Sequence, residues 1–91
     1  MEIKKGNLKI FIGENEDKTI AFMSYSFESK SVIIIDHTFV SLSHRGQNLA
    51  NELFWFMIQM AKENSWLIKP KCSYVIQMFV KNVELQSLLA K

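Results

Sequence analysis

Residues 31–50 read SVIIIDHTFVSLSHRGQNLA, and this stretch decides the fold class. Its first half contains the unbroken apolar run Val32 to Ile35, which is typical of a central strand covered on both faces. The polar segment Ser41 to Gly46 then ends the strand. From Gln47 onward, apolar residues recur at spacings of three and four, which predicts a long helix up to Asn64. Asparagine tolerates the left-handed conformation of a helix C-terminus, so we expect Asn64 to cap this helix.

Two further strands are predicted before this stretch. In Leu8 to Ile12, leucine and isoleucine occupy every second position, which is the period of a strand. Thr19 to Phe27 is rich in aromatic and β-branched residues and is also typical of a strand. The polar connections, residues 13–17 and 28–30, are short. The three strands, of which Ser31 to Val40 is the third, are therefore expected to form an antiparallel meander.

The chain after the helix predicts a fourth strand and two short helices. Trp66 to Ile68 is a short apolar run that ends before Pro70, and its place after a strand and a helix favours parallel pairing with the third strand. Ser73 to Val80 and Leu85 to Leu89 are predicted as short helical pieces around Asn82. The sequence thus predicts an α/β fold: a three-stranded antiparallel meander, a long helix, a parallel fourth strand and C-terminal helices.

Composition and charge restrict the class of protein. The chain has 91 residues, of which 48% are hydrophobic, so we expect one folded domain over residues 1–91 rather than a disordered chain. A net charge of +2 gives little support to nucleic-acid binding. The longest wholly apolar run, Leu53 to Ile58, is far shorter than the roughly 20 residues of a membrane span. One cysteine and two histidines predict no disulfide and no metal site, and they favour a reducing, cytoplasmic location.

The segment between the third strand and the long helix has the chemistry of an anion site. The first amides of a helix lack partners within the helix, and the helix dipole adds partial positive charge there. Arg45 adds a fixed cation that can hold a phosphate through two parallel hydrogen bonds. An ordinary turn with a solvated arginine is the alternative, because the single glycine Gly46 is weak evidence for a phosphate loop.

His37 and Cys72 lie near the ends of two strands that are expected to be neighbours. Alternation along the third strand places His37 on the face of Ile33, Ile35 and Phe39. If the third and fourth strands are parallel, His37 and Cys72 reach the same edge of the sheet, where open α/β sheets bind ligands. A histidine near a cysteine can take the thiol proton. A hydrogen-bonded strand histidine and a small buried cysteine are the alternatives.

Several segments together resemble a known family. His37 to Val40, Arg45 to Ala50 and Lys69 to Tyr74 are similar in order and spacing to the minimal, YjdJ-like branch of the GNAT N-acetyltransferases. The ending Phe79 to Leu89 is similar as well. The resemblance implies a minimal GNAT-like fold in which the third and fourth strands splay apart, and it implies acetyl-CoA or coenzyme A as the ligand between them.

The resemblance also implies roles for individual residues. The backbone of Phe39 and Val40 would pair with the pantetheine amides, and Asn82 would lie near the adenine end of the ligand. The pyrophosphate would lie in the loop made by Arg45, Gly46, Gln47, Asn48, Leu49 and Ala50. His37 and Cys72 match a histidine and a cysteine that are suspected of catalysis in this family.

The sequence departs from the family at two points that bear on function. Asn48 stands where the loop usually has glycine, and the N-terminal helices that shape the acceptor pocket of larger members are absent. We expect an acetyl-CoA-dependent N-acetyltransferase that acts on an amine of a small molecule or a protein. Its acceptor site is expected to be shallow or completed by a protein partner, including a second copy. A CoA-binding module without catalysis is the alternative, and neither nucleic acid nor a membrane is an expected partner.

Overall fold

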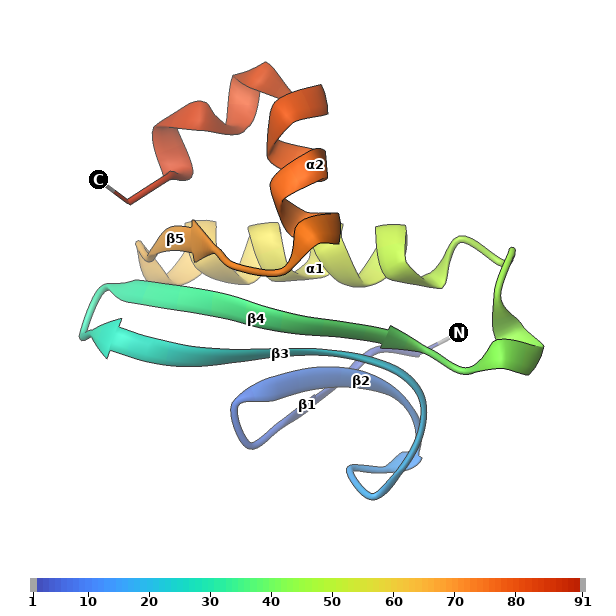
Figure 1. Cartoon of the computed structure of the whole chain (residues 1–91). Coiled ribbons are helices and arrows are strands. Elements are labelled where there is room, and N and C mark those ends of the chain that lie inside the picture. The colour runs from blue at the N-terminus through green and yellow to red at the C-terminus, as the bar shows by residue number, and fades with distance from the viewer. Residues whose placement is uncertain (1, 91) are drawn as a thin grey trace.

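The structure, a computed structural model, describes residues 2–90. The described chain forms a mixed sheet in the order β1-β2-β3-β4-β5, in which β4 and β5 are parallel and the other neighbours are antiparallel (Figure 1). The strands are β1 (Lys4–Gly6), β2 (Lys9–Asn15), β3 (Lys18–Ser29), β4 (Val32–Val40) and β5 (Leu67–Pro70). The helices are α1 (Leu49–Asn64) and α2 (Ser73–Lys81), with two 3-10 helices, η1 (Leu42–His44) and η2 (Val83–Leu88).

The predicted α/β class is confirmed, including the long helix, the parallel strand pair and the C-terminal helices. The predicted meander of three strands is wrong in one respect, because β1 precedes it and makes four antiparallel strands. β1 has three residues, Lys-Lys-Gly, and shows no apolar alternation. Its pairing of Lys4 with Phe11 depends on the neighbouring strand, so the local pattern carries no signal for it.

The core lies between the sheet and α1, which packs along β2, β3 and β4. The spacing of three and four in α1 lines up the residues that are buried, namely Leu49, Leu53, Phe54, Met57, Ile58, Met60 and Ala61. The sheet contributes Ile10, Ile12, Ala21, Met23, Ile33, Ile35 and Ile68. α2 joins the same core, where the ring of Phe79 meets that of Phe54 edge to face with centroids 5.8 Å apart.

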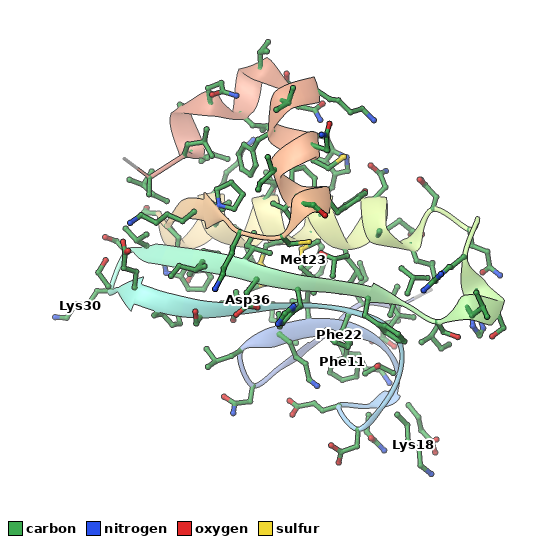
Figure 2. All side chains as sticks on the ribbon, in the orientation of Figure 1. Phe11, Lys18, Phe22, Met23, Lys30 and Asp36 are labelled. Carbon is green, nitrogen blue, oxygen red and sulfur yellow. The ribbon has the colours of Figure 1, made fainter. Side chains whose placement is uncertain are left out.

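The opposite face of the sheet, which we call the outer face, carries a row of aromatic side chains. Phe11, Phe22 and Phe39 are register partners across β2, β3 and β4, so they share this face. The rings of Phe22 and Phe39 are stacked, with centroids 5.4 Å apart. Figure 2 shows Phe11 and Phe22 projecting from the side of the sheet opposite Met23, which lies in the core. Phe39 remains 41% exposed, so this face of β4 is open to solvent.

The two ends of α1 are set by left-handed residues. The predicted cap at Asn64 is wrong by one position, because Ser65 adopts the left-handed conformation (φ 57°) and Asn64 is the last helical residue. The Asn64 side chain instead donates to the carbonyl of Met60 at 2.8 Å. The helix begins at Leu49, and Asn48 before it is also left-handed, with φ 66° and ψ 22°.

A β-bulge in β4 changes the direction of the side chains that follow it. Ser24 pairs with His37 and the next residue, Tyr25, pairs with Ile35, so Asp36 is an extra residue in β4. The Ser24 hydroxyl donates to Asp36 Oδ1 at 2.7 Å, which holds the bulge in place. The bulge reverses the alternation, so Thr38 lies opposite buried Met23 and not on the outer face.

β4 is longer than β5, and this difference opens one edge of the sheet. The last residue of β5, Pro70, pairs with Ile35, whereas β4 continues to Val40 (Figure 1). The amides of Lys71 and Cys72 both donate to the carbonyl of Ile35, at 2.9 and 3.2 Å, and the chain then turns into α2. Residues 37–40 therefore pair with β3 on one side, and no strand of the described residues pairs with them on the other.

Candidate active site

The backbone of the open edge presents groups from alternate residues of β4. The Ser41 amide donates to the carbonyl of Ile20 in the β3 segment, at 2.7 Å. Because backbone groups alternate along a strand, the polar groups of Phe39 also point toward β3, whereas those of Thr38 and Val40 point toward the open edge. Of the two residues expected to pair with pantetheine amides, Val40 thus faces the open edge and Phe39 faces its neighbouring strand.

A pocket of about 370 Å³ lies beside this edge at the start of α1. It is lined by Val40, His44, Arg45, Gly46, Asn48, Leu49, Ala50 and Tyr74. The Arg45 side chain crosses to the strand, where Nε donates to the Val40 carbonyl at 3.2 Å. The structure therefore brings together most of the predicted loop residues and the end of β4. Gln47 is exposed and is not among the lining residues.

The loop before α1 contains two residues with positive φ, although it has a single glycine. Gly46 has φ 88°, a region that favours glycine, and no atom lies within 4 Å of where its Cβ would stand. Asn48 takes the left-handed conformation that a glycine there would take. The amide of Glu52 is the first to close a helical bond, to the Asn48 carbonyl at 3.2 Å. The amides of Leu49 and Ala50 therefore start the helix without such partners and line the pocket.

Cys72 lies at the N-terminus of α2 and faces β4. Its Sγ is 3.5 Å from Thr38 Oγ1, and the thiol donates to that oxygen. Burial raises the pKa of the Cys72 thiol, but the Thr38 hydroxyl and the backbone amides of Val75, Tyr74 and Thr38 lower it by more, so the net shift is downward. This arrangement favours a thiolate at a pH closer to neutrality than free cysteine allows.

His37 does not lie where alternation places it. The bulge at Asp36 turns His37 to the outer face, where it pairs with Ser24 and its side chain is exposed. The expectation that His37 shares a face with Ile33 and Ile35 is therefore wrong. Among the described residues, the side chain that contacts the Cys72 thiol is Thr38 and not His37.

Two lining residues, Tyr74 and His44, add polar groups to the pocket. Burial, and secondarily the charge of Cys72, raises the pKa of the Tyr74 phenol, so Tyr74 keeps its proton at neutral pH. His44 Nδ1 is 3.1 Å from Ser43 Oγ and 3.4 Å from Ser41 Oγ. The position of Tyr74 two residues after Cys72 hints at its place in the site. No local pattern singles out His44 or Thr38.

Asn82 has a structural role in this part of the molecule. Its side chain and its backbone amide both donate to the carbonyl of Met78, at 2.8 and 3.0 Å, so Asn82 ends α2. Asn82 is not among the residues that line the pocket.

Residues 2–90 contain neither a cluster of metal ligands nor a helix that could span a membrane. Within them, no three His, Cys, Asp or Glu side chains come close enough to hold a metal ion. In the same range, no helix combines the length and the apolar character needed to cross a bilayer.

Comparisons with known proteins agree with this geometry. A family model described as GCN5-related N-acetyl-transferase matches residues 9–88. A solved structure of a "GCN5-like putative N-acetyltransferase" from Staphylococcus aureus is 33% identical, with a TM-score of 0.78 over 98% of this chain and 87% of that one. No curated protein matches the chain.

Two larger proteins share the fold at lower identity. The structure of a "putative acetyltransferase" from Deinococcus radiodurans is 16% identical, with a TM-score of 0.56 over 86% of this chain and 54% of that one. A ribosomal-protein-alanine N-acetyltransferase from Brucella melitensis is 18% identical, with a TM-score of 0.54 over 91% and 62%. Because the family model matches nearly the whole chain, the protein belongs to the GCN5-related N-acetyltransferase family, whose members are acyltransferase enzymes.

Proposed function

We propose that this protein transfers the acetyl group of acetyl-CoA to an amine of a small molecule or a protein. The observation that carries the proposal is the open edge of β4 beside a pocket at the start of α1. In that pocket, a cation, unpaired helix amides and a strand carbonyl lie together. A diphosphate attached to a chain of amides has the complementary chemistry.

The residues present fit coenzyme A. Arg45 and the amides of Leu49 and Ala50 would hold the pyrophosphate, and the edge groups of Val40 and Thr38 would accept and donate hydrogen bonds to the pantetheine arm. When bound, acetyl-CoA supplies an activated acetyl thioester. The backbone of the open edge then provides donors for the carbonyl oxygen of that group.

Three side chains around the edge would take part in the reaction, two of them by moving protons. His37 lies on the exposed outer face, from which an amine can approach, so we propose that it takes the proton from the acceptor. Tyr74 lines the pocket and keeps its proton, so it can return one to the departing sulfur. Cys72 Sγ lies 3.5 Å from Thr38 Oγ1 beside the unpaired part of β4, and we propose that its thiol lines the path of the acetyl group.

Isothermal titration with acetyl-CoA, combined with a free-thiol release assay over a panel of amines, tests the proposal. We expect binding, and thiol release that depends on both acetyl-CoA and an amine. The matched control is ADP, which should bind to the same loop but release no thiol. Absence of binding to acetyl-CoA, CoA and ADP would contradict the proposed ligand while leaving the family assignment in place.

A binding module without turnover is the second candidate, and Asn48 favours it. The side chain of Asn48 lines the pocket at a point where the family usually has none. Tight binding of acetyl-CoA without thiol release over the whole amine panel would select this candidate.

A further inference from the structure

We propose that Thr38 is a positioning residue that orients the Cys72 thiol at the open edge of β4 and stabilises its deprotonated form. The inference rests on the contact between Cys72 Sγ and Thr38 Oγ1, 3.5 Å apart, and on the strand geometry that produces it. It concerns the thiol alone and does not depend on which acyl donor or acceptor the protein uses.

The bulge turns the Thr38 side chain toward Cys72. In a regular strand that continued the alternation of Ile33 and Ile35, Thr38 would lie on the outer face. The extra residue Asp36 reverses this order, and its carboxylate accepts a hydrogen bond from the Ser24 hydroxyl that fixes the bulge. Thr38 therefore lies on the core side of the sheet, at the edge of β4 beyond the end of β5.

The cysteine is placed from the other side by the end of β5. The amides of Lys71 and Cys72 share the carbonyl of Ile35, which ties the cysteine beside β4 just before α2 begins. A thiolate at this point receives donors from two elements: the first amides of α2, and the hydroxyl and amide of Thr38. When the thiol loses its proton to water, the Thr38 hydroxyl reverses its hydrogen bond and donates to sulfur.

Other ionisable groups near the thiol do not replace this donor. Tyr74, on α2, is neutral at the pH where the thiol ionises and is coupled to it only through the thiolate charge. Lys71 is exposed on the approach from β5, and His37 points to the outer face of β4. The Thr38 hydroxyl is therefore the hydrogen-bond donor to Cys72 that a single substitution can remove without changing the charge around the thiol.

The test is the pH dependence of Cys72 alkylation by iodoacetamide, followed by intact mass. The chain has one cysteine, so the reaction reports on Cys72 alone. Thr38→Val has nearly the same shape and lacks the hydroxyl. We expect it to move the midpoint of the alkylation profile upward by about one pH unit, since one charge-assisted hydrogen bond is lost. Thr38→Ser restores the hydroxyl and is expected to keep the wild-type midpoint.

Two controls separate this role from packing and from a histidine–cysteine pair. Thr19→Val makes the same change at the chain's other threonine, in β3, and His37→Ala removes the imidazole; neither is expected to move the midpoint. An unchanged midpoint in Thr38→Val, an equal shift in Thr38→Ser, or a wild-type midpoint no lower than that of free cysteine would overturn the proposal. If circular dichroism shows that Thr38→Val does not fold, Thr38→Ala is judged by the same criteria.

Discussion

Arg45 donates a hydrogen bond from Nε to the backbone carbonyl of Val40, at 3.2 Å, and so links the loop before α1 to the end of β4. A guanidinium has five N–H donors, so this bond leaves its terminal amino groups able to meet a phosphate. The strand thus orients the cation before any ligand arrives. A lysine side chain lacks the planar guanidinium and cannot donate to the Val40 carbonyl and to a phosphate from separate nitrogens. Lysine and arginine are therefore not equivalent at position 45.

Substitution of Arg45 is expected to weaken coenzyme A binding even when the charge is kept. Arg45→Lys should raise the dissociation constant about tenfold, and Arg45→Ala should raise it further, since each hydrogen bond to a charged group is worth about 1.5–3 kcal/mol. Isothermal titration with CoA measures both. Lys62→Ala, at the opposite end of α1, is the control for general charge. Equal losses in Lys62→Ala and Arg45→Ala would contradict a specific phosphate contact.

The left-handed residue at the start of α1 predicts opposite effects of glycine and alanine. Asn48→Gly relieves the left-handed conformation and removes a side chain from the pocket, so we expect tighter CoA binding with no loss of stability. Asn48→Ala is expected to lower the free energy of unfolding by about 1 kcal/mol, because alanine is strained in this left-handed conformation. Urea denaturation and CoA titration measure the two effects.

Ser65→Gly is the matched control for this pair, because it relieves the same conformation at the other end of the helix, away from the pocket. Weaker CoA binding in Asn48→Gly would show that the asparagine side chain holds the ligand rather than obstructing it.

His37 and Cys72 are predicted to contribute to turnover through different steps. His37→Ala and Cys72→Ala are each expected to lower the rate of thiol release at least tenfold, which corresponds to about 1.4 kcal/mol of barrier. Because the two side chains do not contact each other, their effects should multiply in the double variant. Steady-state rates with acetyl-CoA measure this. Unchanged rates in both single variants would remove these residues from the mechanism and leave the fold and the ligand proposal intact.

Alkaline pH is expected to destabilise the protein through Tyr25. Burial raises the pKa of this phenol above 10.0, and its ring packs against Phe27 and Trp66. Since the phenol ionises more easily in the unfolded chain, its contribution to stability is complete below pH 10.0 and is lost as the pH rises through the folded-state pKa. Unfolding free energies of Tyr25→Phe between pH 8 and 11 should therefore fall less than those of the wild type. Tyr74→Phe gives a second measurement of the same kind, and a wild-type stability that rises with pH in this range would contradict both.

The parts of the fold that are set by local pattern could be predicted from the sequence. α1 follows from the spacing of its buried face. The apolar run Val32 to Ile35 predicts a central strand covered on both faces; β4 is central, between β3 and β5, but only Ile33 and Ile35 are buried, and Val32 and Ile34 on the other face are half-buried. It could also be predicted that the residues from Arg45 to Ala50 gather at the start of α1, because the order of strand, loop and helix is a local property of the sequence; that they bind an anion stays a prediction. Six of the loop's residues were expected to act together, and all but Gln47 line the pocket.

The parts that depend on pairing between strands could not be predicted in this way. The bulge at Asp36 arises from the register of β4 against β3, so the alternation of β4 alone assigns His37 and Thr38 to the wrong faces. β1 has no strand pattern of its own and is a strand through its antiparallel pairing with β2. Ser65 rather than Asn64 takes the left-handed conformation, although asparagine has the stronger preference: Asn64 is the last helical residue, and its side chain donates to the Met60 carbonyl.

The short length of the unpaired part of β4 also limits what can attach to it. At one end the amides of Lys71 and Cys72 occupy the carbonyl of Ile35, and at the other the guanidinium of Arg45 occupies that of Val40. Sheet edges that promote aggregation are long and flat. The unpaired part of β4 is short and offers few hydrogen bonds to a strand from another chain, so we expect self-association through β4 to be weak.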